Sequence, residues 1–472
     1  MSLATGATTP AVAPAAGSLE AALAAAVPRV HLPGSPAYDE LTATMNALVR
    51  PTPAAVVEAT SADDVARTVR IAGAFGVPVG VMSTGHGTED TMAGAVVVAT
   101  RALDDLVVRP AERTARIGAG VRWRDVLAAA APHGLAGLCG SSPSVGVVGF
   151  LTGGGVGPLA RSHGLSADHV VSFEVVTGDG QIRHASADSE PDLYWGLRGG
   201  KGTLGIVTSV ELELVELREV YAGSLWFDEA DVPAMLRTWA VWSTLLPDEG
   251  TTSAAILRLP PMPDVPPFLT GKTVLQVRFV WTGDPAVGEE MIRAMRGVVT
   301  PLADTVALMP YERIGEVHAD PDAAMPMRTE HVLLDDLDPA GVERLLDLAG
   351  PGSATVQLMV EVRRTGGALE RPLRGETAFA ARDARWFVFM IGLVLPGTDE
   401  LVAADARRIV DGLAPIARPG GMPNFVPRYG AEWARQAFPA RTAERLAALS
   451  RRYDPAGVLL GGRLVRELSP LP

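Results

Sequence analysis

The sequence predicts an α+β protein in which mixed strands and helices are followed by an antiparallel sheet that helices cover on one side. Up to residue 214, short apolar runs typical of buried strands alternate with stretches of helical periodicity. From about Tyr221, longer strand patterns alternate with single helices, which is typical of an antiparallel sheet with one covered face. At 472 residues the chain exceeds the size at which one core stops growing, so we expect two domains.

Composition and charge narrow the class of protein. The net charge of −13 argues against a nucleic-acid partner and against recruitment to anionic membranes. No run approaches the roughly 18 apolar residues of a membrane span. Cys139 is the only cysteine, which excludes an intramolecular disulfide and a cysteine-based zinc site. We therefore expect a cytoplasmic protein, monomeric or homodimeric, whose residues 1–17 form a disordered Ala/Pro/Thr-rich tail.

The order of elements follows from apolar periodicity and from the residues that begin and end each run. Ser61, followed by two aspartates, is a typical cap at the start of a helix, and Gly76 ends that helix. In the first part we expect strands at 53–59, 78–82, 95–99, 170–177 and 206–214, and helices at 61–76 and 123–131. In the second part we expect strands at 222–227, 252–259, 272–281, 355–365 and 386–395, and helices near 230–246, 285–298, 339–349, 399–413 and 442–452. A proline-rich loop is expected at 260–270.

One loop stands out because a histidine lies between two glycines. The strand expected at 78–82 leads into Ser-Thr-Gly-His-Gly-Thr at 83–88, which places the histidine at position 86. Glycine lets a backbone approach a ligand closely and adopt positive φ. From this stretch alone, a histidine that faces a ligand and an incidental histidine in a tight turn are equally good interpretations.

A glycine-dense region follows at 137–157, with the sequence GLCGSSPSVGVVGFLTGGGVG. Glycine at this density costs folding entropy and is typical of backbone amides that lie against a large flat or anionic ligand. The alternative is a flexible linker, but the interleaved valine, leucine and phenylalanine residues argue against it. Residues 200–205 match GxGxxG, yet an alternating strand follows where a helix would have to begin, which argues against a nicotinamide-type Rossmann site.

Together these stretches resemble the flavin-dependent oxidases of the p-cresol methylhydroxylase / vanillyl-alcohol oxidase superfamily, and within it the berberine-bridge-enzyme-like branch. The matching stretches are the Thr-Gly-His-Gly loop (84–87), Pro-Ser-Val-Gly (143–146), Thr-Gly-Gly-Gly-Val-Gly (152–157), His-Gly-Leu-Ser-Ala-Asp (163–168), Trp-Gly-Leu-Arg-Gly-Gly (195–200), Gly-Ile-Val-Thr (205–208), Pro-Asn-Phe (423–425) and Tyr-Asp-Pro (453–455). They occur in family order, and the combination is specific although no single piece is.

The resemblance implies how the chain is divided and what it binds. It implies a PCMH-type FAD-binding domain at 18–217, a substrate domain at 218–418 and a C-terminal segment at 419–472 that completes the FAD domain. It also implies that the imidazole of His86 is bonded to the 8α-methyl group of FAD. The other cofactor-binding residues that it implies are Ser83, Thr84, Gly85, Gly87, Thr88, Ser142, Pro143, Val145, Gly146, Gly149, Gly153, Gly154, Gly155, Gly157, Gly205, Ile206, Val207 and Asn424. No metal is expected, and His318 matches no ligand position.

The chain departs from the family pattern at points that change what is expected. Many members have a second flavin link from a cysteine directly before the Pro-Ser/Thr-Val-Gly motif, whereas this chain has Ser142 there, so we expect a single covalent link. The tyrosine that usually comes two residues before the motif asparagine is Met422, and the Asp-Pro-x-Asn turn ends in Gly457, so the roles of those side chains are not carried over. Val145 lies at the position of the oxygen gatekeeper, where a small residue favours an oxidase and ordinary packing is the alternative.

The strand expected at 355–365 carries the acid–base candidate. Alternation puts Val360 and Val362, with Val356 and Leu358, on a face that should pack on helices, and Glu361 with Gln357, Met359 and Arg363 on the other. From the residues alone, that other face is better interpreted as facing water. The resemblance changes this interpretation, because the family has a general base five residues before the Gly-Gly that ends this strand. It implies Glu361 as the base, with Arg363 able to lower its pKa or to bind an anionic substrate.

The expected reaction is the two-electron oxidation of a small organic substrate, an alcohol, phenol or amine. Glu361 takes a proton while a hydride passes to flavin N5, the electrons then reach O2 and give hydrogen peroxide, and Asn424 lies beside the flavin ring or the substrate. The Ala/Arg/Gly/Pro-rich composition indicates a GC-rich bacterial genome, and the family implies a role in secondary metabolism. Two alternatives stay open: a dehydrogenase that uses a quinone or carrier, and a non-catalytic flavoprotein. A metal hydrolase is excluded because ligands at HxH or HExxH spacing are missing.

Overall fold

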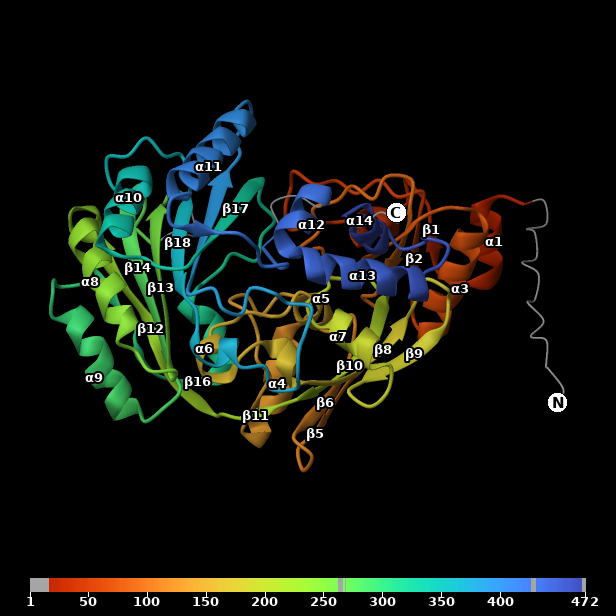
Figure 1. The fold of residues 1–472 in the computed structure, drawn as a ribbon, viewed down its shortest axis with the longest axis horizontal. Helices are drawn as coiled ribbons and strands as arrows, with labels where there is room; N and C mark the ends of the chain where they lie inside the picture. The colour runs from red at the N-terminus through yellow and green to blue at the C-terminus, as the bar shows by residue number, and fades with distance from the viewer. Residues whose placement is uncertain (1–16, 262–265, 268, 426–429, 469–472) are drawn as a thin grey trace.

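The computed structural model describes residues 17–261, 266–267, 269–425 and 430–468 (Figure 1). The tail predicted at 1–17 lies almost entirely outside the described residues, and so does part of the loop at 260–270. Strands before residue 217 form sheets of four, five and two strands, whereas the described strands from β12 to β20 form one nine-stranded sheet. We call the part built on the smaller sheets the first lobe and the part built on the nine-stranded sheet the second lobe. The second lobe lies at the left in Figure 1 and the first lobe at the right.

The four-stranded sheet of the first lobe positions the histidine loop. Its order is β1-β2-β4-β3, and β2 and β3 both run parallel to β4. As predicted, Ser61 caps α3 by accepting from the backbone N–H of Asp64, and Val65 and Val69 are buried beneath the sheet. The elements are α1 (Leu19–Ala26), β1 (Val30–His31), α2 (Pro36–Leu41), β2 (Ala55–Glu58), α3 (Ala62–Ala74), β3 (Val79–Met82) and β4 (Val96–Ala99).

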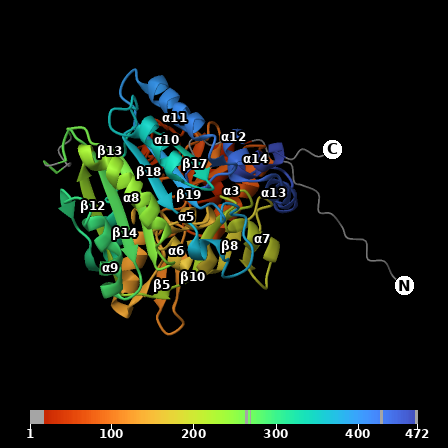
Figure 2. The same cartoon turned by 60° about the vertical axis from the view of Figure 1, so that its left-hand side comes forward.

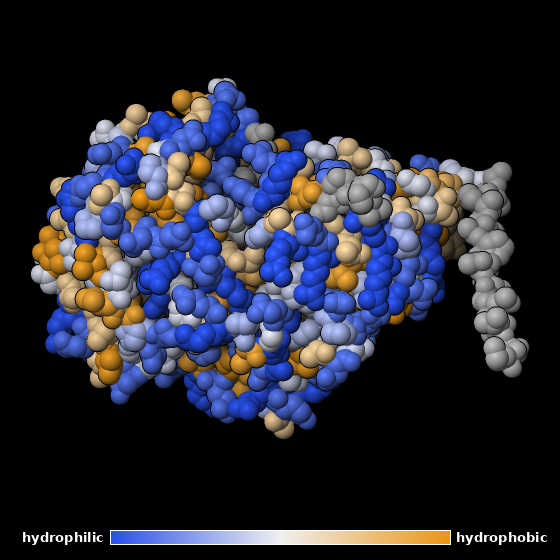
Figure 3. Space-filling model, viewed as in Figure 1, coloured by the Kyte–Doolittle hydropathy of each residue, from blue (hydrophilic) through white to orange (hydrophobic). Residues whose placement is uncertain are grey.

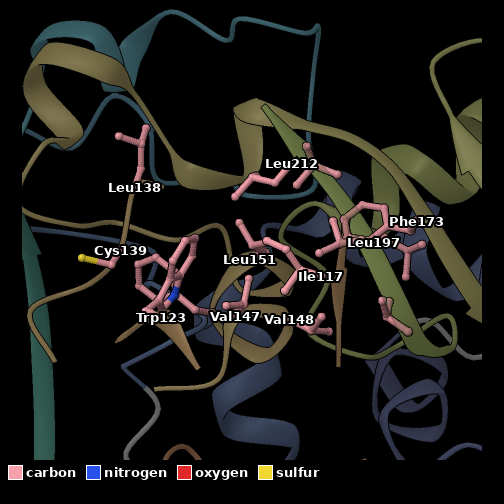
Figure 4. Packing of buried hydrophobic residues seen from close by; sticks show 14 of the residues in the cluster. Ile117, Trp123, Leu138, Cys139, Val147, Val148, Leu151, Phe173, Leu197 and Leu212 are labelled. Atoms are coloured by element: carbon pink, nitrogen blue, oxygen red, sulfur yellow. The ribbon is translucent and has the colours of Figure 1, made fainter. Parts of the chain in front are cut away.

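The five-stranded sheet is antiparallel, in the order β5-β6-β10-β8-β9, and packs on the main core of the first lobe. Figure 4 shows Trp123, Leu151 and Phe173 in this core, all of them buried. The GxGxxG run leads into strand β10, which agrees with the rejection of a Rossmann site. The elements are β5 (Leu106–Arg109), β6 (Thr114–Gly118), α4 (Trp123–Ala130), β7 (Leu135–Ala136), α5 (Val147–Thr152), α6 (Ala160–His163), β8 (Val170–Val176), β9 (Ile182–Ser186), α7 (Pro191–Leu197), β10 (Ile206–Glu213) and β11 (Val215–Glu216).

The nine-stranded sheet of the second lobe is antiparallel and is covered by helices on one face, as predicted. Along the main path the order is β15-β12-β14-β13-β18-β19-β17-β20, and β16 pairs with β12. Val360 and Val362 of β18 are buried against Trp239 of α8 and Ile409 of α11. The elements are β12 (Glu219–Asp228), α8 (Val232–Thr244), β13 (Gly250–Arg258), β14 (Thr273–Trp281), α9 (Pro285–Arg296), β15 (Ala303–Asp304), β16 (Ala307–Pro310), β17 (Met327–Leu334), α10 (Pro339–Ala349), β18 (Met359–Arg364), β19 (Trp386–Leu393), α11 (Asp399–Leu413) and β20 (Ala417–Arg418).

The C-terminal segment returns to the first lobe. Helices α12 (Ala431–Ala437), α13 (Ala440–Tyr453) and α14 (Leu460–Leu468) lie on the first lobe in both Figure 1 and Figure 2. Trp433, Leu446 and Val465 are buried in the core that also holds Trp123. Leu459 forms a parallel bridge with Val79 at the start of β3. The last part of the chain therefore packs beside the strand that carries the histidine loop.

Two features of the fold differ from what the sequence predicts. Strand β18 begins at Met359, four residues later than predicted, and Gln357 does not share the face of Glu361. Its side-chain amide instead donates to the Val402 carbonyl on α11, because Asp405 of the same helix holds residues 355–357 through hydrogen bonds to Thr355 and to the backbone N–H of residue 356. The short helices α5, α6, α7 and α12 and strand β17 give little periodicity in the sequence and were not predicted, and helix α14 was missed although its sequence is amphipathic.

Figure 3 shows one face of the molecule, on which hydrophilic residues predominate and hydrophobic residues are scattered between them. None of the helices in the described part of the chain is long and apolar enough to cross a membrane.

Candidate functional site

The histidine loop begins where β3 ends and is fixed on both sides by its neighbours. Gly85 has a φ of 71°, and an added methyl group there would collide with the carbonyl oxygen of Ala43, so this position requires glycine. The hydroxyl of Ser83 donates to the Ala119 carbonyl at 2.9 Å, and Nε of Arg101 donates to the Ser83 carbonyl at 2.8 Å. These contacts hold the backbone from which the side chain of residue 86 projects.

His86 lies in the wall of a cavity of about 300 Å³. Most of the wall comes from residues within five segments that are distant in the sequence, 79–90, 140–149, 201–207, 424–425 and 459–461, although not every residue of each segment contributes. The predicted cofactor residues in this wall are Ser83, Thr84, Gly85, His86, Gly87, Thr88, Ser142, Val145, Gly146, Gly149, Gly205, Ile206, Val207 and Asn424. We call this space the glycine cavity.

Five predicted cofactor residues lie outside the described lining of the glycine cavity: Pro143, Gly153, Gly154, Gly155 and Gly157. An added methyl group on Gly153 would collide with Oδ1 of Asn424, and one on Gly157 would collide with the carbonyl oxygen of Cys139. Glycine at these positions therefore lets protein segments pack closely against each other.

The surroundings of His86 keep its imidazole neutral. Burial lowers the pKa of His86 below its ordinary value, Asp320 opposes the shift, and Lys201 adds to it. A neutral imidazole has a free lone pair on one ring nitrogen, which a bond from that nitrogen to carbon requires.

The wall of the glycine cavity fits the flavin cofactor that the sequence implies. Nothing lies within 4 Å of the place that a methyl group on Gly149 would occupy, so a flat ring can approach the backbone there. Glycine, serine and threonine are common in the lining, although Val148 and Phe150 flank Gly149. The lining also holds Glu89 and Asp90, and the ammonium group of Lys201 supplies a positive charge beside Gly149 that suits an anionic cofactor.

Lys201 was not among the residues predicted from the sequence. It has a φ of 53°, which is rare outside glycine, and its ammonium donates to Oδ1 of Asn424 at 2.6 Å and to the Gly149 carbonyl at 3.1 Å. The Asn424 amide in turn donates to the Phe150 carbonyl at 2.8 Å. Burial lowers the pKa of Lys201 to about 8. The signal in the sequence was a lone charged residue within the run Gly-Gly-Lys-Gly at 199–202.

Cys139 is placed outside the described lining of the glycine cavity, in agreement with its position in the sequence. It is buried beside Tyr311, with 3.7 Å between its sulfur and the tyrosine oxygen. Burial raises the pKa of Cys139 to about 12, so the unreactive thiol form predominates at neutral pH. Ser142 does line the cavity, and its hydroxyl lies 2.7 Å from the hydroxyl of Ser144.

Glu361 lies in the second lobe, fully buried, in a cluster with two arginines. Its Oε2 accepts from Nε of Arg363 at 2.8 Å. Its Oε1 accepts from the Ser253 hydroxyl at 2.7 Å and from Nη1 of Arg278. Burial alone would raise the pKa of Glu361, but the guanidinium groups of Arg363 and Arg278 outweigh it and hold that pKa well below its usual value. Glu361 is therefore a carboxylate at neutral pH.

Strand register explains how this cluster assembles. Arg278 of β14 is opposite Ser253 of β13, which is opposite Arg363 of β18, which is opposite Phe387 of β19. Side chains directly opposite each other across a sheet lie on the same face. These four residues therefore form one row on the face that the helices leave uncovered, and Glu361 projects from the same face two residues away.

This row is the floor of a second cavity, of about 40 Å³, which we call the arginine cavity. Its described lining is Val156, Gly157, Pro158, Ala160, Thr251, Thr252, Ser253, Arg278, Val280, Val317, His318, Arg363, Arg364, Thr365 and Phe387. Val156 and Arg363 also line the glycine cavity, so the two cavities adjoin. Glu361 is in neither described lining, and it lies behind Ser253, Arg278 and Arg363, which do line the arginine cavity.

Arg278 and His318 were missed from the sequence, and only the fold brings them to Glu361. Nε2 of His318 lies 3.8 Å from Oε1 of Glu361. Burial and, to a smaller extent, the positive charge of Arg278 lower the pKa of His318 to about 3, so its imidazole is neutral. The alternation around Arg278 in the strand predicted at 272–281 could have indicated a polar face, but its pairing partners could not be known without the register.

The two departures in the C-terminal segment have structural roles of their own. Met422 is buried, and its backbone N–H donates to Nε2 of His331 at 3.3 Å. Asp454 is fully buried, and its carboxylate accepts from the backbone N–H groups of Val458 and Leu459. The turn is thus closed by the aspartate, and Gly457 within it has a φ of 67°.

Within the described ranges, no group of three or more His, Cys, Asp or Glu side chains could hold a metal ion.

Comparisons with known proteins agree with the geometry of the glycine cavity. A protein-family model described as an FAD binding domain matches residues 53–186. Over 435 residues the chain is 28% identical to the (R)-6-hydroxynicotine oxidase of Paenarthrobacter nicotinovorans, covering 85% of this chain and 89% of that protein.

Two solved structures have the same fold. BBE-like 1 of Physcomitrella patens superposes with a TM-score of 0.82 at 20% identity and covers 94% of this chain and 98% of that one. The glucooligosaccharide oxidase of Acremonium strictum superposes with a TM-score of 0.80 at 21% identity, with the same two coverages, and carries a 6-S-cysteinyl, 8α-N1-histidyl FAD.

Proposed function

We propose that the chain is an FAD-dependent oxidoreductase of the berberine-bridge-enzyme-like kind, in the p-cresol methylhydroxylase / vanillyl-alcohol oxidase superfamily, and that it oxidises a small alcohol, phenol or amine with O2 as the electron acceptor. The observation that carries this proposal is the glycine cavity, in which the histidine loop, the segment at 140–149 and the segment at 201–207 meet around His86. Val145 in the same wall supports O2 as acceptor, since a small side chain leaves room for it.

The residues that would hold FAD are those of the glycine cavity. His86 would hold it through a bond from its imidazole to the 8α-methyl group, and the neutral state of this imidazole supports that role. With Ser142 in the wall and Cys139 buried as a thiol beside Tyr311, we propose a single covalent link. Held there, FAD would supply the redox chemistry, which is acceptance of a hydride at N5 and transfer of the electrons to O2 to give hydrogen peroxide.

The second lobe would supply the acid–base chemistry. Glu361 is ionised at neutral pH, which a proton acceptor requires, while Arg363 and Arg278 make it a weaker base than a free carboxylate. Because the Ser253 hydroxyl lines the arginine cavity and donates to Glu361 at 2.7 Å, it offers a path for a proton from the substrate to the carboxylate. Arg363 borders both cavities and would orient the substrate between them, and Asn424 would lie beside the flavin ring or the substrate.

We assign the FAD domain to residues 18–217 and 419–472, and the substrate domain to residues 218–418. The separate sheets on either side of residue 217 and the packing of α12–α14 on the first lobe support this division.

The test is to purify the protein after expression with ample flavin, record its absorption spectrum and measure the mass of the denatured chain. We expect a yellow protein whose mass exceeds that of the sequence by one FAD, and whose colour stays with the acid-precipitated protein. The His86→Ala variant should lose the added mass and release any flavin into the supernatant. A colourless wild-type protein would refute the proposed function, whereas colour released by acid from the wild type would refute only the covalent link.

The acceptor is tested on the same preparation. After anaerobic reduction with dithionite, admitting air should reoxidise the flavin within seconds and give one hydrogen peroxide per flavin. Reoxidation by a quinone but not by air would identify a dehydrogenase and contradict the oxidase proposal.

A further inference from the structure

We propose that the arginine cavity binds a carboxylate group of the substrate, so that this enzyme oxidises small organic acids and not cationic amines. This inference rests on the proposed function, because it assigns the substrate class of the same site. Three observations support it: the balance of charge in the cavity, the polar atoms left without a partner in its wall, and its size.

The charges of the lining are unbalanced. Among the described residues that line the arginine cavity, Arg278, Arg363 and Arg364 are cations, and none is acidic. Glu361, behind the wall, is shared by the first two arginines. Arg364 donates to the Arg385 carbonyl and lies over the ring of Trp386, and neither contact neutralises it. Because His318 is neutral, the wall of the arginine cavity carries three cations, and one carboxylate, Glu361, lies behind it. Glu370 and Asp336 also act on Arg364 from outside the lining, but the cations Arg161 and Arg385 outweigh them. An anion that enters the cavity would therefore meet an excess of positive charge.

The wall also holds donors that lack a partner. In the part of the chain that the structure describes, four buried polar atoms of this lining make no hydrogen bond: Oγ1 of Thr251, Nε of Arg278, Nδ1 of His318 and Nε of Arg364. A hydroxyl group and guanidinium nitrogens are donors, and a neutral imidazole can donate from Nδ1. A carboxylate accepts about four hydrogen bonds and donates none. The set of free donors therefore matches a carboxylate and not an ammonium group.

The size of the cavity agrees with a carboxylate. By the volume that one water molecule needs, about 10–15 Å³, a cavity of about 40 Å³ holds roughly three heavy atoms. That is one carboxylate group and little more. Among the rest of the described lining, Val156, Val280 and Phe387 are apolar and suit the carbon skeleton next to the carboxylate. Because Arg363 and Val156 border both cavities, one small molecule can place its carboxylate on the arginines and its reacting carbon in the glycine cavity.

The closing experiment measures binding of benzoate and benzamide to the purified, flavin-containing protein. The two probes have the same ring and nearly the same shape, but only benzoate is charged. Isothermal titration calorimetry reads both, and changes in the flavin spectrum report whether the ring reaches the glycine cavity. We expect benzoate to bind at least 10-fold more tightly than benzamide.

Three variants locate the binding. Arg278→Gln should weaken benzoate about 10- to 100-fold, the loss of a charged hydrogen bond, and leave benzamide unchanged. Arg278→Lys keeps the charge and should give an intermediate loss. The control is Arg258→Gln, on the neighbouring strand β13. The guanidinium of Arg258 is partly buried, lies outside both cavities and donates to the carbonyls of Ala349 and Gly350. This variant should leave benzoate binding unchanged.

Equal affinity for the two probes, no binding of benzoate, or the same loss in Arg278→Gln and Arg258→Gln would each overturn the proposal. Calorimetry does not need flavin, so the two hypotheses fail separately. A colourless protein that binds benzoate refutes the proposed function. A yellow protein that binds benzoate and benzamide with equal affinity refutes the carboxylate site.

Discussion

The two adjoining cavities are built in opposite ways. The glycine cavity is lined mainly by backbone and small side chains of loops in the first lobe, whereas the arginine cavity is lined by side chains that project from neighbouring strands of a rigid sheet in the second lobe. A loop of glycines can lie against a large ligand that supplies the chemistry itself. A sheet holds charged groups at fixed spacing, which suits orientation and proton transfer. Under the proposed function, this difference separates the part of the site that would bind the cofactor from the part that would bind the substrate.

The first prediction, with the largest effect, asks whether the second lobe supplies chemistry. With any substrate that reduces the flavin, Glu361→Gln should slow reduction by 10²–10⁴, because the proton acceptor is lost while its shape is kept. Stopped-flow absorbance of the flavin under anaerobic conditions measures this rate. Asp405→Asn is the control, since it removes another buried carboxylate of this lobe that hydrogen-bonds residues 355–357 on the helix-covered side. If Glu361→Gln, folded and yellow, reduced at the wild-type rate, Glu361 would not be the base.

A second prediction concerns the seam between the lobes. Asp168 of the first lobe, 1% exposed at its side chain, accepts two hydrogen bonds from Arg382, at 2.6 and 2.9 Å. Asp168→Asn should lower the free energy of unfolding by about 3–5 kcal/mol, because it leaves a nearly buried guanidinium without its counter-charge. Urea denaturation followed by tryptophan fluorescence measures it.

The matched control for this seam is a surface pair. Arg237 and Glu343 form a bidentate pair with both side chains 51% exposed. Glu343→Gln should lower the free energy of unfolding far less than Asp168→Asn does, because water screens an exposed ion pair. Equal losses in the two variants would show that the buried pair does not hold the lobes together.

A third prediction separates glycines that face the cofactor from glycines that face protein. Gly153→Ala should cost about 1–3 kcal/mol of stability, since its methyl group would collide with Asn424. Gly149→Ala has open space and lies in α5, so its stability should be unchanged or slightly higher, while its flavin content should fall because the methyl group enters the glycine cavity. Thermal unfolding and the ratio of flavin to protein absorbance distinguish the two effects. Loss of flavin in Gly153→Ala with unchanged stability would assign that glycine to the cofactor instead.

The same contrast between loops and a sheet explains how much of each cavity could be predicted from the sequence. The histidine loop could be predicted because a strand, two glycines and His86 are neighbours in the chain and need no distant partner. The alternation of β18 put Glu361 and Arg363 on one face, which the structure confirms, but Arg278 and Ser253 join them from 83 and 108 residues away from Glu361. Their meeting depends on the register of three strands, which a single sequence does not encode locally.

The glycines show what local sequence cannot predict even where it locates a binding region. Within one run, Gly146 and Gly149 line the cavity and Gly153, Gly154, Gly155 and Gly157 do not. Composition is the same for both groups, so density of glycine predicted a ligand-binding region without showing which residues face the ligand. Lys201 was missed for a related reason, because the GxGxxG pattern is defined by its glycines and specifies nothing about the charged residue between them.

The smallest predicted effect concerns pH and again the contact between lobes. His331 of β17 is 2% exposed and accepts from the backbone N–H of Met422, two residues before Asn424. Burial lowers the pKa of His331 to about 4 from its ordinary 6.5, so the unfolded chain binds a proton that the folded protein excludes. The contribution of His331 to the free energy of unfolding is therefore fully present above pH 6.5 and is lost as the pH falls toward 4. Between pH 7.5 and 5.5 the loss from this group should be about 1 kcal/mol, measured by urea denaturation.

Two variants test whether His331 causes this loss. His331→Gln keeps an acceptor for the N–H of Met422 without a titrating group and should remove the loss. His184→Gln, which changes an exposed histidine of β9, should leave it in place. An unchanged pH dependence in His331→Gln would mean that this imidazole is protonated in the folded protein, and the segment carrying Asn424 would then be held by a different contact.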